Sequence, residues 1–153
     1  MPRVRKMERR DIGAVLEIQA ACPEIAQWSA GDYERAAAGE IACWVVDDDL
    51  GVSGFLVARE LISEAEILNL AVRTDIRRRG IGSELIAEAI DWSGGLGAEK
   101  VFLEVRESNE KAIRFYERHG FVAAGRRPGY YAAPVEDALV LTLPSQQGPG
   151  QSR

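Results

Sequence analysis

The sequence has little cysteine and histidine, and this scarcity excludes two classes of site. Its 153 residues include two cysteines and one histidine. Cys22 and Cys43 are widely spaced, and neither has a His or Cys neighbour at the spacing of a metal site or of a disulfide framework. We interpret both as reduced thiols that pack as small hydrophobic side chains in a cytoplasmic protein, and we expect no metal.

Long apolar runs and an excess of positive charge are also missing. No stretch approaches the ~20 apolar residues of a membrane span, and no apolar segment follows the charged N-terminus as it would in a secretory signal. The chain has 24 acidic and 19 basic residues, which give a net charge of −5. A general nucleic-acid binder needs a basic excess to neutralise many phosphates. We therefore expect a cytoplasmic protein whose partner is neither a nucleic acid nor a membrane.

The remaining pattern is that of one α/β domain. A chain of 153 residues with 46% hydrophobic residues can bury a single substantial core. Apolar periodicity and turn residues predict strands over 2–7, 42–46, 52–62, 65–72, 100–106, 121–126 and 139–143, and helices that begin near Asp11, Ser29, Gly82 and Asn109. This order predicts a mixed α/β sheet with helices on both faces. We expect the domain to span residues 1–143 and the polar tail over 144–153 to be disordered.

The stretch between the strand over 65–72 and the next helix organises the chain. It reads Arg77, Arg78, Arg79, Gly80, Ile81, Gly82. Glycines let a pyrophosphate approach the main chain, the first N–H groups of a helix favour an anion, and arginines add positive charge. The pattern is neither the three-glycine dinucleotide motif nor a P-loop. Taken alone, so short a pattern is more often a solvated basic run beside a helix cap.

A second group of residues lies on the strand over 100–106 and on the helix after it. Glu104 interrupts an apolar strand, where a carboxylate is costly unless that face opens to water or to a partner. Tyr116 lies on an amphipathic helix, where an aromatic side chain is more often part of the core. His119 precedes Gly120 in the last helical turn, where a cation suits the helix dipole, so we interpret it as structural. Because these motifs follow a phosphate-type loop, we favour a functional role for Glu104 and Tyr116.

These motifs together resemble the GNAT acetyltransferase superfamily. The run from Arg77 to Gly82 is similar to its coenzyme A pyrophosphate loop, which reads Gln or Arg, two variable residues, Gly, one variable residue, then Gly or Ala. Within the superfamily the chain most resembles the ribosomal-protein-alanine N-acetyltransferases, through Trp28-Ser29, Asn69-Leu70-Ala71-Val72, Leu103-Glu104-Val105-Arg106, Ser108-Asn109, Phe115-Tyr116-Glu117 and Tyr130-Tyr131. The resemblance spans about residues 3–143. It implies the GNAT fold, with a mixed and mostly antiparallel sheet of six or seven strands.

The resemblance also implies roles for individual residues. Acetyl-CoA would be the co-substrate, with Glu104 as general base and Tyr116 as general acid. The coenzyme would be bound by Leu70, Ala71, Val72, Arg77, Arg78, Arg79, Gly80, Ile81, Gly82, Ser83 and Asn109. The acceptor would contact Trp28, Tyr130 and Tyr131.

The implied acceptor is the N-terminal α-amine, of Ala or another small residue, of a protein such as a ribosomal protein. The implied enzyme is a monomer or a homodimer. The chain departs from the alanine acetyltransferases in the acceptor region, because Pro128-Gly129 stands before the tyrosines where they have Arg-Asn or similar residues. Two alternatives therefore stay open. One is acetylation of a small-molecule amine or a lysine, and the other is a coenzyme-A-binding module without catalysis.

Overall fold

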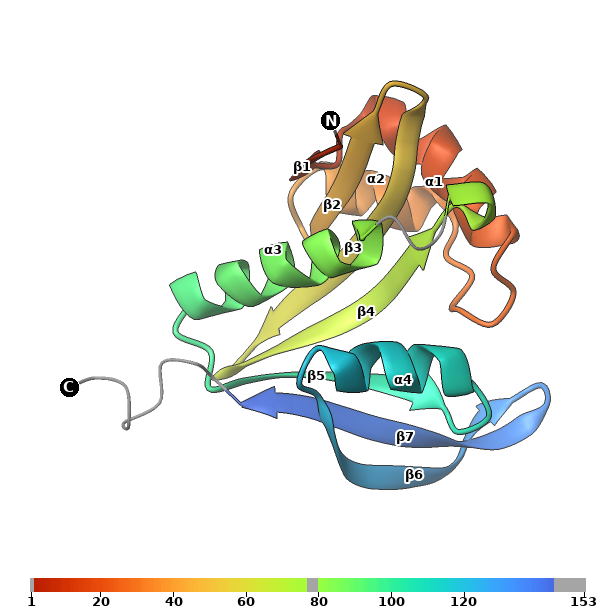
Figure 1. Cartoon of the computed structure of the whole chain (residues 1–153), viewed down its shortest axis with the longest axis vertical. Coiled ribbons are helices and arrows are strands. Elements are labelled where there is room, and N and C mark those ends of the chain that lie inside the picture. Colours follow the sequence, from red (N-terminus) through yellow and green to blue (C-terminus); the bar gives the residue numbers. More distant parts are fainter. Residues whose placement is uncertain (1, 77–79, 145–153) are drawn as a thin grey trace. The chain divides into compact units, whose positions relative to one another are not determined.

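The computed structural model describes residues 2–76 and 80–144 (Figure 1). These residues form two compact units, one from residues 2–59 with 67–91 and the other from 60–66 with 92–144. The three arginines of the predicted pyrophosphate loop, Arg77, Arg78 and Arg79, lie outside the described residues, and so does the tail over 145–153.

Helices and strands follow one another in the predicted order. The described residues form β1 (Arg3–Lys6), η1 (Arg9–Asp11), α1 (Ile12–Ala20), α2 (Ala30–Ala37), β2 (Ala42–Asp48), β3 (Gly51–Leu61), β4 (Glu64–Val72), η2 (Thr74–Ile76), α3 (Ile81–Gly95), β5 (Lys100–Arg106), α4 (Glu110–Arg118), β6 (Val122–Ala132) and β7 (Val135–Pro144). The elements η1 and η2 are single 3-10 turns that the apolar periodicity does not reveal. Seven strands are present in the described part of the chain, within the predicted number.

The first unit contains the strand order β1-β2-β3-β4. Both β1 with β2 and β2 with β3 are antiparallel, with Val4 opposite Val46 and Val45 opposite Phe55. The predicted hairpin joins β2 to β3, where Asp48 pairs with Gly51, which adopts a left-handed φ of 104°. This backbone region favours glycine, which explains why the acidic turn ends in that residue.

Helices cover both faces of this part of the sheet, as predicted. On one face α1 and α2 pack their apolar side chains, among them Val15 and Tyr33, into a buried cluster with Phe55 of β3. Successive strand residues point to opposite faces, so Gly54 lies on the other face. A Cβ atom at Gly54 would lie 3.0 Å from Ile81 Cγ2 of α3. Figure 1 shows α1 and α2 on one side of β2 and β3 and α3 on the other.

Gly54 permits a close approach of α3 to the sheet. Besides Ile81, a Cβ atom there would meet the main-chain oxygen of Ala71 at 3.1 Å and Leu85 Cδ1 at 3.4 Å. Contacts this short leave no room for a side chain without displacing the helix. The absence of a side chain at position 54 therefore sets the start of α3 directly beside the end of β4.

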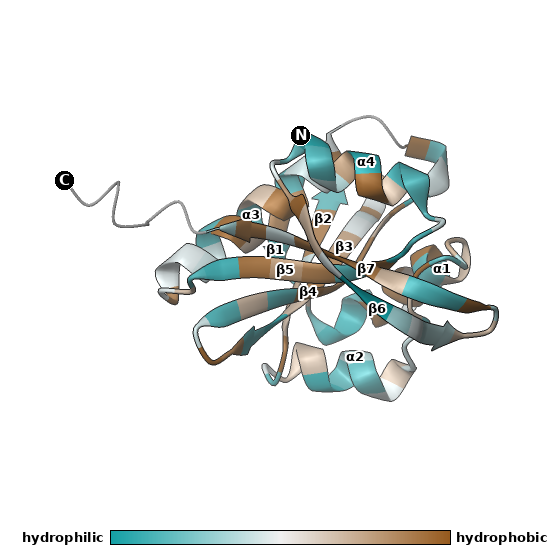
Figure 2. Cartoon of the chain, turned by 90° about the horizontal axis from the view of Figure 1, so that it is seen from below, coloured by the Kyte–Doolittle hydropathy of each residue, from teal (hydrophilic) through white to brown (hydrophobic). Residues whose placement is uncertain are grey.

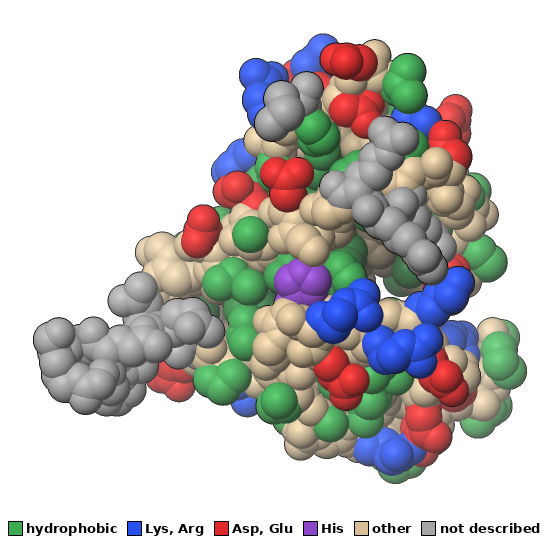
Figure 3. Space-filling model, viewed as in Figure 1, with side chains coloured by type: hydrophobic (Ala, Val, Ile, Leu, Met, Phe, Trp, Pro, Cys, Tyr) green, Lys and Arg blue, Asp and Glu red, His purple; other side chains and the backbone are tan. Residues whose placement is uncertain are grey.

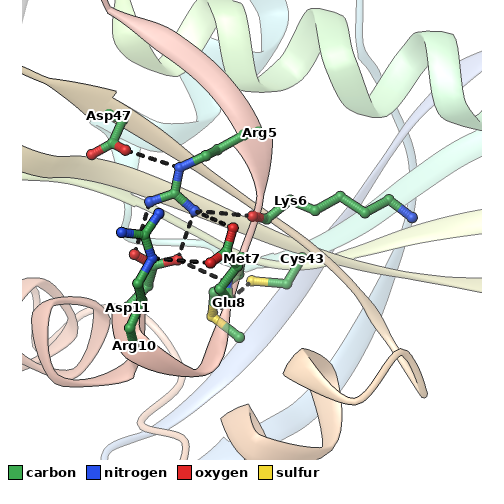
Figure 4. A network of polar contacts seen from close by, with 8 residues as sticks. All are labelled: Arg5, Lys6, Met7, Glu8, Arg10, Asp11, Cys43 and Asp47. Carbon is green, nitrogen blue, oxygen red and sulfur yellow. Dashed lines mark hydrogen bonds and ion pairs between the residues drawn. The ribbon is translucent and has the colours of Figure 1, made fainter.

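A buried ion-pair network fastens the N-terminal segment (Figure 4). Arg5 of β1 donates two hydrogen bonds to the Asp11 carboxylate, at 2.8 and 2.9 Å, and one to Asp47 of β2 at 2.9 Å. Asp11 is 5% exposed and also accepts from the Glu8 N–H at 2.8 Å. Burial by itself would raise the pKa of Asp11, but the hydrogen bonds from Arg5 and Glu8 outweigh it and lower that pKa below its ordinary value. The network joins β1, η1 and β2 into one structure.

The second unit contains the strand order β5-β7-β6, with both pairs antiparallel. Glu104 of β5 lies opposite Val140 of β7, and Val140 lies opposite Gly125 of β6. In α4, Tyr116 is buried and its ring meets that of Phe121 edge-on at 5.5 Å. Figure 2 shows hydrophobic residues concentrated along β5 and β7, whereas β6 is largely hydrophilic and its residues are mostly exposed.

The two last strands are longer than the sequence predicts. The predicted connection over 127–138 is largely strand, because β6 runs to Ala132 and β7 begins at Val135 and includes Pro144. The Pro128-Gly129 pair does not end β6 but lies in a bulge between Arg127 and Tyr131. Gly129 has a φ of 60°, and its N–H donates to Asp137 Oδ1 at 2.9 Å. The side chain of Asp137 thus replaces the ladder partner that the bulge removes.

Candidate functional site

The first unit carries the predicted coenzyme-binding segments. Gly80 is exposed with a φ of 76°, and a Cβ atom there would meet nothing within 4 Å. Ile81 begins α3 and is buried, whereas Gly82 and Ser83 lie in its first turn. The first N–H groups of a helix have no acceptor within it, and the helix dipole adds partial positive charge. The described part of this loop is therefore an open, glycine-containing helix start, where main-chain N–H groups favour an anion.

The predicted contacts of the acetyl and pantetheine arm are the last three residues of β4, Leu70, Ala71 and Val72. Ala71 is buried, while Leu70 and Val72 are half-buried. The chain continues from β4 through Arg73, whose N–H donates to the Ser53 carbonyl at 2.8 Å, so β3 supports the strand end beyond the regular ladder.

A buried polar cluster holds the segment between α1 and α2, which ends in the predicted acceptor residue Trp28. Gln19 of α1 donates from Nε2 to the Trp28 carbonyl at 2.8 Å and accepts from the Trp28 N–H at 3.0 Å. The Tyr33 hydroxyl donates to Gln19 Oε1 at 2.5 Å. Asn69 of β4 donates to the Ala26 carbonyl at 3.0 Å. Helix and strand side chains thereby fix the main chain of this loop.

In the second unit, the predicted base Glu104 forms an ion pair. Its Oε2 accepts a hydrogen bond from Arg127 Nη1 at 2.7 Å. The Glu104 side chain is 12% exposed and that of Arg127 is 55% exposed. The hydrogen bond to Glu104 raises the pKa of Arg127, and the more distant charge of Glu66 adds to the effect. The Glu104 carboxylate is thus a nearly buried anion, and its ion-pair partner Arg127 is exposed to solvent.

The predicted acceptor residues Tyr130 and Tyr131 lie beside this carboxylate. Their ring centroids are 5.0 Å apart, and the Arg127 guanidinium carbon lies 4.1 Å from the Tyr130 centroid. Burial raises the pKa of Tyr131, and the nearby Tyr130 and the Glu104 charge raise it further. Arg106 covers the Tyr131 ring at 4.3 Å. The structure therefore brings Glu104, Tyr130 and Tyr131 together in one cluster.

Helix α4 carries the other two predicted residues. Asn109 is its N-cap, and its Oδ1 accepts from the Ala112 N–H at 3.3 Å. Tyr116 is buried between the rings of Phe115 and Phe121, and this burial raises the pKa of its phenol above the ordinary value. None of the described hydrogen bonds, ion pairs or ring contacts joins Tyr116 to Glu104.

His119 caps the C-terminus of α4, with Nδ1 2.8 Å from the Phe115 carbonyl oxygen. This position agrees with the structural role expected from the sequence. Figure 3 shows the histidine in purple at the surface, and on that face the Lys and Arg side chains lie among Asp and Glu side chains.

Sequence reasoning assigned no role to three residues that shape these surroundings. Gln19 is a polar residue on the apolar stripe of α1, which is the signal that could have revealed it. Arg127 stands close to Tyr130-Tyr131 in sequence, but nothing in the sequence pairs it with Glu104. Asp137 follows the tyrosines by six residues, and only the hairpin register brings it to Gly129.

Two other kinds of site are absent from the part of the chain that the structure describes. No group of three or more His, Cys, Asp or Glu side chains is placed there to hold a metal ion. None of the helices over 2–76 and 80–144 is both long and apolar enough to cross a membrane.

Three comparisons bear on the identity of the chain. It is 39% identical over 95 residues to the [ribosomal protein bS18]-alanine N-acetyltransferase of Salmonella typhimurium, a match that spans 61% of this chain and 64% of that protein. The crystal structure of the ribosomal-protein-S18-alanine N-acetyltransferase from Escherichia coli aligns with a TM-score of 0.84 and 27% identity, covering 100% of this chain and 99% of that one. The structure of Arabidopsis thaliana NAA60 in complex with acetyl-CoA, at 23% identity, aligns over 94% of this chain and 98% of that one with a TM-score of 0.84 and shows the shared fold.

The family model for the acetyltransferase (GNAT) family matches residues 12–121. This range extends from the start of α1 across Gly80, the start of α3 and the strand that carries Glu104 to Phe121, which follows α4. The chain therefore belongs to the GNAT acetyltransferase family.

Proposed function

We propose that this chain is an N-acetyltransferase that moves the acetyl group of acetyl-CoA to the N-terminal α-amine of a protein. The acceptor would begin with Ala or another small residue, as in a protein such as a ribosomal protein. Family membership and the names of the relatives support this reading. The observation that carries it is the cluster of Glu104 with Tyr130 and Tyr131, because a shielded carboxylate beside aromatic rings suits a cationic amine that must lose a proton.

The remaining site residues take the roles expected from the family resemblance. Residues 70–72 would contact the acetyl and pantetheine arm, and residues 77–83 would hold the pyrophosphate. Asn109 uses its Oδ1 for the helix cap, so its amide N–H groups would donate to the coenzyme arm. The domain would span residues 1–143 and act in the cytoplasm, as a monomer or homodimer and without a metal.

Proton energetics favour an N-terminal acceptor over a lysine. An α-amino group has a pKa of about 7.7–8.0, so removing its proton at pH 7 costs about 1 kcal/mol. A lysine amine near pKa 10.4 costs roughly 4–5 kcal/mol. A single carboxylate, acting directly or through one water, is therefore a sufficient base for the α-amine.

The reaction would need no covalent enzyme intermediate. The ammonium gives one proton to Glu104, and the freed nitrogen lone pair attacks the thioester carbon. A carbon–nitrogen bond forms and the carbon–sulfur bond breaks, which leaves coenzyme A as a thiolate. The attacking nitrogen releases its second proton to water, so the product is a neutral amide, and water returns a proton to the sulfur or to the Tyr116 phenolate. Tyr116, kept protonated because burial raises the pKa of its phenol, donates a hydrogen bond or its proton to that sulfur. A main-chain N–H near Val72 would stabilise the oxyanion.

The direct test measures coenzyme A release from acetyl-CoA in the presence of a short peptide with a free N-terminal Ala and one internal Lys. The control is the same peptide already acetylated at its N-terminus. We expect turnover of the free peptide alone. Equal turnover of both peptides would move the reaction to the lysine, and turnover of neither would contradict the proposal.

A small-molecule amine is the second candidate acceptor. The Pro128-Gly129 bulge favours it, because it changes the course of β6 beside Tyr130, where the alanine acetyltransferases carry other residues. A free amine such as alaninamide with a higher kcat/KM than any Ala-initiated peptide would support this candidate.

A further inference from the structure

The cation paired with Glu104 is a side chain of this protein, the guanidinium of Arg127. Arg127 donates from Nη1 to Glu104 Oε2 at 2.7 Å and lies over the Tyr130 ring at 4.1 Å. Its guanidinium thus occupies both features that would attract a protonated amine, a carboxylate and an aromatic face.

Two neighbouring arginines of the second unit are held differently. Arg106 is 21% exposed and donates to Glu136, to the Pro134 carbonyl at 3.1 Å and to the Ala133 carbonyl at 3.3 Å. Arg126 lies between the carboxylates of Glu107 and Asp137. Arg127, within the described residues, donates one hydrogen bond, and its acceptor is the proposed base. It is therefore the arginine of the three that can leave its partner most easily.

The backbone beside Arg127 also suits a side chain that moves. Arg127 is the last residue of β6 that pairs in register with β7 before the bulge. The hydrogen bond from the Gly129 N–H to Asp137 stabilises the bulge beyond it. The guanidinium is more than half exposed, so it can turn into solvent, and an incoming protonated amine would replace it as the partner of the nearly buried Glu104 carboxylate.

We propose that Arg127 is an internal competitor of the acceptor amine, and that its guanidinium leaves Glu104 when a protonated amine binds there. This inference rests on the proposed function, which makes an amine the acceptor. Two cations at one carboxylate repel each other, and one ring face takes one cation at a time. After acetylation the nitrogen is an uncharged amide, so Arg127 returns to Glu104 and no charge holds the product there.

The test compares Arg127→Ala and Arg127→Lys with Arg126→Ala, a matched control on the same strand that also removes an ion-paired arginine. Binding of a free Ala-initiated peptide and of its N-acetylated form is measured calorimetrically with each enzyme saturated with coenzyme A. We expect Arg127→Ala to bind the free peptide about three- to tenfold more tightly, the range of an exposed ion pair and one cation–π contact. The acetylated peptide should change by less than about twofold.

The two controls separate charge from structure. Arg127→Lys keeps a cation and should stay nearer to wild type than Arg127→Ala, and Arg126→Ala should match wild type for both peptides. Thermal unfolding of each variant checks that the fold is intact. Weaker or unchanged binding of the free peptide by Arg127→Ala, or equal tightening for both peptides, would overturn the inference.

The binding measurement needs no turnover, so it separates the two proposals. If the wild-type enzyme acetylates neither peptide but Arg127→Ala changes peptide binding as expected, the proposed reaction is refuted and the role of Arg127 as a competitor is supported. If the wild-type enzyme acetylates the free peptide but Arg127→Ala does not change binding in this way, the reaction is supported and the competitor role of Arg127 is refuted.

Discussion

Glu104 and Tyr116 are the two residues on which the proposed chemistry depends, and their surroundings differ. Glu104 meets a solvent-exposed cation, whereas the Tyr116 ring lies among other aromatic rings. Glu104→Gln and Tyr116→Phe keep the size of each side chain and remove the proton acceptor or donor. We expect each variant to lower kcat by about 10²-fold or more, measured by coenzyme A release. Glu110→Gln, an exposed residue of α4, is the control, and values for both site variants within about twofold of it would refute the roles.

Asp11 provides a prediction about stability and pH. Its pKa is lowered in the folded state, so its stabilising effect is complete above the unfolded value of about 3.9 and is lost as the pH falls through the lower folded value. Asp11→Asn leaves Arg5 short of a buried partner and should cost about 2–3 kcal/mol at pH 7. Urea unfolding at several pH values would measure both effects. As the pH falls below about 4, the free energy of unfolding should decrease less for Asp11→Asn than for wild type. Parallel plots of this free energy against pH would contradict the prediction.

At the scale of elements, the Gln19 cluster positions the loop that carries Trp28. Gln19→Ala removes both side-chain bonds to the Trp28 main chain and leaves the Tyr33 hydroxyl without its acceptor. We expect a loss of about 1–3 kcal/mol in unfolding free energy and a larger rise in the KM for the peptide than for acetyl-CoA. Glu17→Ala, on the exposed side of the same helix, is the control. Equal changes in both KM values would show that the loop does not serve the acceptor.

Two glycines of the α3 region should respond oppositely to alanine. Gly80 has a φ of 76°, a conformation that costs an L-residue roughly 1–2 kcal/mol although its Cβ would find open space. Gly94 lies within α3 without a positive φ, and its Cβ would also meet nothing within 4 Å. We expect Gly80→Ala to raise the KM for acetyl-CoA and lower stability, and Gly94→Ala to gain about 0.5–1 kcal/mol. Thermal unfolding and acetyl-CoA titration of both variants test this pair.

At the scale of the whole molecule, a net charge of −5 acts on any charged acceptor. A peptide with Lys or Arg after its N-terminal Ala should show a KM that rises several-fold between about 0.05 and 0.5 M salt, because screening weakens its attraction to an acidic enzyme. The same peptide with Glu at those positions is the control and should show no such rise. Equal salt dependence would mean that net charge does not govern encounter.

The order of elements was predictable because it depends on local periodicity and turn residues, as in the capping box of Ser29 and the glycine after the acidic hairpin. The path of β6 was not predictable. Pro128 and Gly129 are strong signals that a strand ends. Here they form a bulge instead, because the β6–β7 register brings the Asp137 side chain to the Gly129 N–H. The choice of Glu104 and Tyr131 as site residues followed from the family resemblance, whereas the pairing of Arg127 with Glu104 required the three-dimensional structure.

The burial of both cysteines has a practical consequence for spectroscopy. Cys22 is 2% exposed and Cys43 6%, and burial raises the pKa of the Cys43 thiol to about 12. Thiolates are the species that react with maleimides, so the native chain should label slowly at neutral pH. A cysteine introduced at an exposed position such as Val122 would then be the preferred attachment point for a fluorophore. A single introduced cysteine can therefore be labelled while the two native cysteines react slowly. A fluorophore at that position would report movements of the β6–β7 hairpin in solution.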